Sequence, residues 1–144
     1  MSDLILMDGD KVLFLPAFGG AIVIVQPGKL QGSGPACIGG NKVCVAGDEV
    51  RVSVPGCTYM TPQYSIPGVG TLKIAKLARD QMARKTRSGG KAVLIKGSRF
   101  SAKFEVQSAA KQPPPGPGSP VPDPSPQYSG EGLFVPANLK LSAA

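Results

Sequence analysis

The sequence predicts a mainly β protein, a small sandwich-like or barrel-like body with one short helix. Gly (19) and Pro (15) are abundant in a chain of 144 residues, and both residues favour turns over helix interiors. Apolar residues alternate in short runs, which is typical of half-buried strands. A similar unit also occurs three times, which predicts one compact body with internal repetition. Each unit has a Gly turn, a Lys and an alternating apolar run: MDGDKVLFLPAF (7–18), IGGNKVCVAGDEV (38–50) and SGGKAVLIKGSRF (88–100).

The individual strands follow from period-two alternation and from β-branched content. Turn pairs such as Asp8-Gly9, Pro27-Gly28 and Pro55-Gly56 separate them. The mean spacing of about ten residues is typical of a small all-β body. The expected strands are Lys11–Leu15, Ala21–Val25, Lys42–Val45, Glu49–Val54, Tyr64–Ile66, Thr71–Ile74, Ala92–Lys96 and Ala102–Val106.

One helix is expected at Ile74–Lys85. Ile74, Leu77, Ala78, Gln81 and Met82 would share its inner face, with the charged side chains on the other side.

Three segments are expected along the chain: a body at 1–111, a linker at 112–126 and a tail at 127–144. The linker, QPPPGPGSPVPDPSP, holds eight Pro and predicts an extended, polyproline-like segment. The tail regains apolar residues and is expected either to fold back as one strand or to dock on a partner. These apolar residues are Leu133, Phe134, Val135, Leu139 and Leu141.

The net charge of +7 is unevenly distributed. Residues 1–72 carry four Lys/Arg and five Asp/Glu, whereas residues 73–111 carry eleven Lys/Arg against Asp80 and Glu105. Such asymmetry marks either an interaction surface or a solvated face. No apolar run reaches the roughly 20 residues of a membrane span, and the N-terminus MSDLILMDGD has no signal-peptide character. The chain is therefore expected to be cytoplasmic when made.

Little catalytic chemistry is available, so the chain is not expected to be an enzyme. It contains no His, the usual general base near neutral pH, and no nucleophile elbow or phosphate loop. Asp8 with Asp10, and Asp48 with Glu49, are carboxylate pairs in Gly turns, where Asp usually bonds the backbone.

The three cysteines, Cys37, Cys44 and Cys57, match no standard zinc spacing. We expect reduced core thiols and no cofactor, with a zinc or iron site on the three thiolates as the alternative.

A small basic β-barrel that binds nucleic acid is the alternative function. Gly47–Val52 has the turn-and-strand pattern of such barrels, and the basic half of the chain could follow phosphates. Against it, aromatic residues for base stacking make up only 6%. Phe14, Phe18, Tyr59, Tyr64, Phe100 and Phe104 also form no cluster with basic residues in the sequence.

The stretch 39–81 with 88–106 resembles the PAAR-like spike-tip proteins of contractile injection systems, which include type VI secretion systems and extracellular phage-tail-like particles. The likeness spans about residues 3–107 and rests on the order of several short motifs. These are Gly47-Asp48-Glu49, Val54–Cys57, Tyr64–Gly70, Asp80-Gln81, Gly90-Lys91 and Phe100–Phe104. Val43–Ala46 stands where the family has Pro-Ala-Ala-Arg, and the His-rich, metal-binding apex is missing. The family's metal site therefore does not carry over.

The resemblance implies a small cone of short strands and hairpins on the blunt end of a homotrimeric, VgrG-like β-helical spike, with one tip per trimer. A single chain can match a three-fold partner only by repeating a unit, as the three Gly–Lys–strand units do. When the sheath contracts, the tip would puncture the target membrane. It would leave the cell with the particle. Attachment of effector cargo would be a further role, and nucleic acid would not be a partner.

Overall fold

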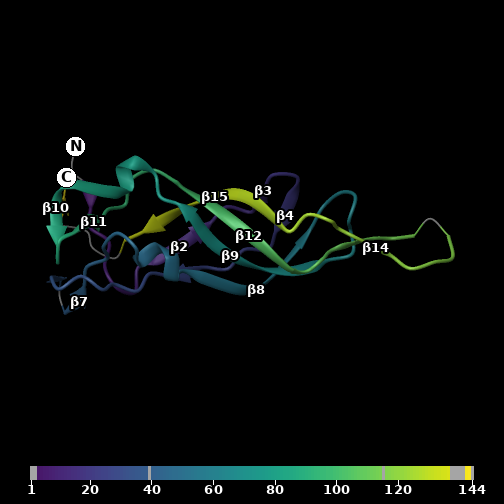
Figure 1. Cartoon of the computed structure of the whole chain (residues 1–144), viewed down its shortest axis with the longest axis horizontal. Helices are drawn as coiled ribbons and strands as arrows, with labels where there is room; N and C mark the ends of the chain where they lie inside the picture. Colours follow the sequence, from purple (N-terminus) through teal and green to yellow (C-terminus); the bar gives the residue numbers. More distant parts are fainter. Residues whose placement is uncertain (1–2, 39, 115, 137–141, 144) are drawn as a thin grey trace.

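An elongated antiparallel β structure is seen in the computed structural model, which describes residues 3–38, 40–114, 116–136 and 142–143 (Figure 1). Its main sheet has eight strands in the order β3-β4-β8-β9-β12-β15-β2-β5. The sheet is curled. Phe18 of β3 contacts Gly130 of β15, although these two strands are five positions apart in the order of the sheet.

Strands dominate the described residues, which confirms the mainly β prediction. Two short 3-10 turns are the helical elements of this part of the chain, η1 (Asp48–Arg51) and η2 (Arg79–Gln81). The strands are β1 (Asp3–Leu4), β2 (Lys11–Phe14), β3 (Ala17–Phe18), β4 (Ala21–Val23), β5 (Gly28–Lys29), β6 (Cys37–Ile38), β7 (Asn41–Lys42), β8 (Ser53–Met60), β9 (Gly68–Lys76), β10 (Met82–Ser88), β11 (Lys91–Leu94), β12 (Phe100–Ser108), β13 (Lys111–Gln112), β14 (Val121–Pro122), β15 (Gln127–Val135) and β16 (Ser142–Ala143).

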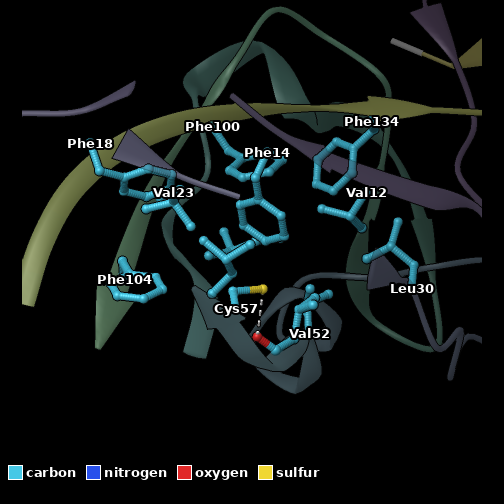
Figure 2. Close-up of a cluster of buried hydrophobic side chains, with 14 of the residues drawn as sticks. Val12, Phe14, Phe18, Val23, Leu30, Val52, Cys57, Phe100, Phe104 and Phe134 are labelled. Carbon is cyan, nitrogen blue, oxygen red and sulfur yellow. Dashed lines mark hydrogen bonds between the residues drawn. The ribbon is translucent and has the colours of Figure 1, made fainter. Parts of the chain in front are cut away.

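The concave side of the curled sheet holds an aromatic core (Figure 2). Phe100 lies between Phe14 and Phe134, with ring centroids 5.6 Å and 5.0 Å away. The ring of Phe100 also sits over Gly132, where an added Cβ would lie 2.4 Å from Cζ. Glycine at this position lets the aromatic ring press directly on the β15 backbone.

The two ends of the molecule differ (Figure 1). One end carries both termini and three two-stranded sheets, which are β1–β16, β6–β7 and β10–β11. The opposite end carries the β13–β14 pair, in which Gln112 faces Val121, and the Pro-rich loop between them.

The expected helix at Ile74–Lys85 is wrong. Ile74 continues β9 and faces Ala102 of β12, and Met82–Ser88 forms β10, paired with β11. The intervening Gln81 is fully buried and bends the chain, because its Oε1 accepts a hydrogen bond from the amide of Ala78 at 2.9 Å.

Four expected strands correspond to β2, β4, β9 and β12. The strand expected at Glu49–Val54 begins instead as η1 and becomes β8 only at Ser53, and Tyr64–Ile66 has a single bridge, from Ile66 to Lys111. The strand expected at Lys42–Val45 begins at the last residue of β7 and continues as isolated bridges of Val43 and Val45. The strand expected at Ala92–Lys96 begins within β11 and continues as the isolated bridge of Ile95.

The segment expected as a tail is partly a core strand. β15 pairs with β12 on one side and with β2 on the other, and Phe134 is fully buried. Residues 127–135 therefore fold back as one strand of the main sheet, which is the first of the two alternatives expected for the tail. Leu139 and Leu141 lie outside the described residues.

Candidate functional site: a ring of three strand segments

Three segments far apart in the sequence, residues 4–10, 42–48 and 92–98, join in a closed ring of backbone hydrogen bonds. The amide of Leu6 donates to the carbonyl of Leu94 at 3.0 Å. Leu94 donates in turn to Cys44 at 2.8 Å, and Cys44 donates back to Leu6 at 2.9 Å. The three middle residues therefore have the same role, each donating to one neighbour and accepting from the other.

A second set of bonds repeats the pattern farther from the centre. Asp8 donates to Lys42 at 2.7 Å, Ala46 to Ala92 at 2.8 Å and Lys96 to Leu4 at 2.9 Å. Each donor lies two positions after a middle residue, and each acceptor lies two positions before one. The six bonds thus relate the segments by a pseudo-three-fold axis.

The pairing also shows how the segments run. Each pairs antiparallel with both neighbours, through the bridges Ile5–Ile95, Met7–Val43 and Val45–Val93. Three strands along one axis cannot all be mutually antiparallel, since reversing direction twice restores the first direction. Each segment therefore pairs with one neighbour through its first half and with the other through its second half, forming a triangle around the axis.

The ring separates two apolar layers, because side chains of a strand alternate between its faces. Leu6, Cys44 and Leu94 are fully buried and belong to the main core. Five of the side chains that flank them form a second cluster on the other face with Ala83 of β10, and all six are 2–6% exposed. The five are Ile5, Val43, Val45, Val93 and Ile95.

Each segment ends in a tight turn around a glycine with positive φ: Gly9 (90°), Gly47 (104°) and Gly97 (56°). In two copies an Asp closes the turn. Asp10 Oδ2 accepts from the amide of Met7, and Asp48 Oδ2 from that of Val45, each at 2.8 Å. These bonds confirm the structural role expected for the Asp residues of the Gly turns.

In the third copy Ser98 replaces the Asp. Its hydroxyl instead donates to Asp80 Oδ1 at 3.0 Å, and the amide of Ile95 donates to the carbonyl of Gln81 at 3.0 Å.

The first repeat unit differs from the one that the sequence suggested. The sequence suggested a first unit at residues 7–18, MDGDKVLFLPAF. In that unit the Asp8-Gly9 turn precedes the strand, like the Gly turns that open the other two units. In the ring, Gly9 corresponds to Gly47 and Gly97, which follow their strands. The first unit is therefore residues 4–10, and LILMDGD, KVCVAGD and AVLIKGS are the equivalent sequences. A search for the shared G-D/S turn, in place of the Lys, would have found this alignment.

The three cysteines occupy different surroundings. Cys44 lies in the ring, Cys57 is buried in the main core and donates to the carbonyl of Val54 at 3.6 Å, and Cys37 is exposed. Burial, with the charges of Asp48, Asp10 and Asp8, raises the pKa of the Cys44 thiol above its ordinary value. Burial also raises the pKa of Cys57. Among the described residues, no three His, Cys, Asp or Glu side chains are placed to hold a metal.

The aromatic side chains considered for base stacking are mostly inside the protein. Five of them, Phe14, Phe18, Tyr59, Phe100 and Phe104, are at most 4% exposed. They therefore offer no stacking surface to a nucleic acid.

The whole sequence, residues 1–144, matches the family of contractile injection system spike tip proteins. A search of curated proteins returns no match. The chain belongs to this spike tip family, as its resemblance to PAAR-like proteins predicted, and its role is structural. Spike tips act with the spike and baseplate of an injection system. Within the described residues, no helix has the length and apolarity needed to cross a membrane.

Proposed function

We propose that this chain caps the blunt end of a homotrimeric, VgrG-like β-helical spike, with one tip per trimer, and that it has no enzymatic activity. The observation that carries the proposal is the hydrogen-bonded ring of Leu6, Cys44 and Leu94. Symmetric partners bind best to surfaces that repeat with the same symmetry. A single chain can offer three-fold repetition only internally, as this ring does.

The end of the molecule with the ring would face the spike, because the described residues of the other end show no comparable three-fold repetition. The Pro-rich loop (113–120) would then lead when the sheath contracts and would be the first part to meet a target membrane. Effector cargo, if carried, would also attach at this free end. The tip would be made in the cytoplasm and leave the cell with a type VI apparatus or a phage-tail-like particle.

The test is reconstitution with the spike protein of the same injection system. We expect a stable complex of one tip per spike trimer by size-exclusion chromatography with light scattering. Three tips per trimer, or no complex in either high or low salt, would contradict capping. Salt-dependent retention on immobilised nucleic acid without such a complex would favour the nucleic-acid alternative.

A further inference from the structure

Strand β10 closes the end of the molecule that carries the ring. Ala83 of β10 is 4% exposed and belongs to the second apolar cluster, together with ring residues such as Ile5 and Val93. β10 thus covers the ring's outer layer, and Figure 1 shows it at the extreme end of the molecule, next to β11. The outward side of β10 is therefore part of the terminal surface of this end.

That terminal surface is cationic. Arg84, Lys85 and Arg87 of β10 are exposed, and so is Lys91 at the start of β11. No acidic residue lies in the sequence between Asp80 and Glu105. Among the described residues, the ion pairs join Glu105 to Lys73 and Lys103, on β9 and β12. Asp80 accepts a hydrogen bond from Ser98 instead. The four cations of the hairpin therefore have no ion-pair partner in the described part of the chain.

The fold itself does not require this charge. Covering the apolar layer needs only the inward side chains of β10, such as Ala83. Neighbouring like charges repel one another and are normally interspersed with acidic groups. An unneutralised set of cations at a symmetric end is the expected counterpart of a negatively charged partner.

We propose that Arg84, Lys85, Arg87 and Lys91, here the cationic hairpin, bind a carboxylate-rich end of the trimeric spike protein. The inference rests on the proposed capping function and adds the chemistry of the interface. The β6–β7 hairpin, at a related place in the second repeat, carries only Lys42 among Lys and Arg. The cationic hairpin therefore engages one of three identical acidic sites, and the tip docks in three equivalent orientations.

The experiment compares the affinity of two charge-reversal variants for the purified spike trimer. R84E/K85E reverses two exposed side chains of the cationic hairpin. K103E/K111E makes the same change in charge on β12 and β13, away from the ring. Binding is measured by biolayer interferometry at about 0.05 M and about 0.5 M NaCl, since screening is weak at the first and strong at the second.

We expect the affinity of the unmodified tip to fall at least about tenfold between the two salt concentrations. In low salt, R84E/K85E should bind the trimer at least about tenfold more weakly than the unmodified tip, and its affinity should depend little on salt. The affinity of K103E/K111E should stay within about threefold of that of the unmodified tip. Thermal unfolding of R84E/K85E should match the unmodified protein, because both altered side chains are exposed. K103E/K111E should be slightly less stable, because it replaces the ion pair between Lys103 and Glu105 with two like charges.

Several results would overturn the inference. If the unmodified tip binds the trimer with an affinity that does not depend on salt, and R84E/K85E binds equally well, the cationic interface is refuted and capping is left intact. Failure of the unmodified tip to bind the trimer would refute both. Salt-dependent binding to phosphatidylserine vesicles that needs Arg84 and Lys85, with trimer binding unchanged in R84E/K85E, would assign the cations to a membrane and refute the inference.

Discussion

The hydroxyl of Tyr59, on β8, donates a hydrogen bond of 3.0 Å to Asp123 Oδ2, which lies 64 residues away at the end of the Pro-rich segment. The same phenol oxygen accepts the amide of Ala110 at 2.9 Å, before that segment begins. Tyr128 also donates to Asp123. One buried tyrosine thus fixes both ends of the Pro-rich excursion to the core, so that its base is held while its tip extends into solvent.

Replacing Tyr59 by Phe should destabilise the protein by about 1–3 kcal/mol, because it leaves the amide of Ala110 and a buried carboxylate oxygen short of a partner. Urea unfolding followed by circular dichroism measures the change. Tyr64→Phe is the matched control, since the Tyr64 hydroxyl makes no hydrogen bond within the described residues. Equal losses in the two variants would show that the Tyr59 network contributes little.

Stability should fall at both extremes of pH. Burial opposes ionisation of Asp123, but hydrogen bonds from Tyr128, Ser125 and Tyr59 outweigh it and lower the pKa below 3.8. A lowered carboxyl pKa stabilises the fold above the unfolded value, and this stabilisation is lost as pH falls through the folded value. Burial is the main cause that raises the pKa of Tyr59 from 10.0 to about 12. Its contribution is present below pH 10 and is lost as pH rises toward 12.

Chemical unfolding at a series of pH values checks both limbs. Asp123→Asn should flatten the acid limb, and Tyr59→Phe the alkaline limb. If neither variant changes the shape of the profile, other groups govern it.

Gly132→Ala should destabilise the protein by about 1–3 kcal/mol through overpacking. The new methyl group would lie 2.4 Å from Phe100 Cζ and 2.6 Å from the carbonyl oxygen of Leu13. Gly20→Ala is the control, because its Cβ meets nothing within 4 Å and Gly20 does not have positive φ. Differential scanning calorimetry compares the two. A Gly132 variant as stable as the Gly20 variant would mean that the Phe100 ring shifts freely.

Cys44→Ala tests whether the ring thiol is a core side chain or a metal ligand. Removing one buried sulfur atom should cost about 1–2 kcal/mol as a small cavity. The zinc and iron content of the purified protein should not change. Cys37→Ala, at an exposed position, should change stability by less than about 0.5 kcal/mol. Stoichiometric metal in the unmodified protein that either substitution removes would establish a thiolate site.

Local patterning predicted the strands that alternate in burial, since Val12 and Phe14 face inward while Lys11 and Leu13 do not. It failed at Ile74–Lys85, where a helical spacing of apolar residues occurs by chance in a strand, a turn and another strand. Pairing with β11 and β12 decided the outcome there, and a pairing partner is not visible within a twelve-residue window.

The three-fold repetition of the site was predicted from the sequence, but the first of the three units was aligned wrongly. The Lys before each apolar run suggested a first unit at residues 7–18. The ring shows that the repeated feature is the strand that precedes the turns at Gly9, Gly47 and Gly97. The sequence showed that residues 73–111, which include the cationic hairpin, are basic. Only the fold places the hairpin over the ring.

Shortening the Pro-rich loop should separate its role from that of β15. Joining Gln112 to Val121 through Asn-Gly keeps the β13–β14 pair and should change stability by less than about 1 kcal/mol, since loop length costs little. Ending the chain at Pro126 removes β15 from between β12 and β2, so we expect this protein to be unfolded by circular dichroism. The shortened-loop protein should still bind the spike trimer, because the loop lies at the end away from the ring (Figure 1). If it folds but does not bind, the Pro-rich end contacts the spike and the proposed orientation is reversed.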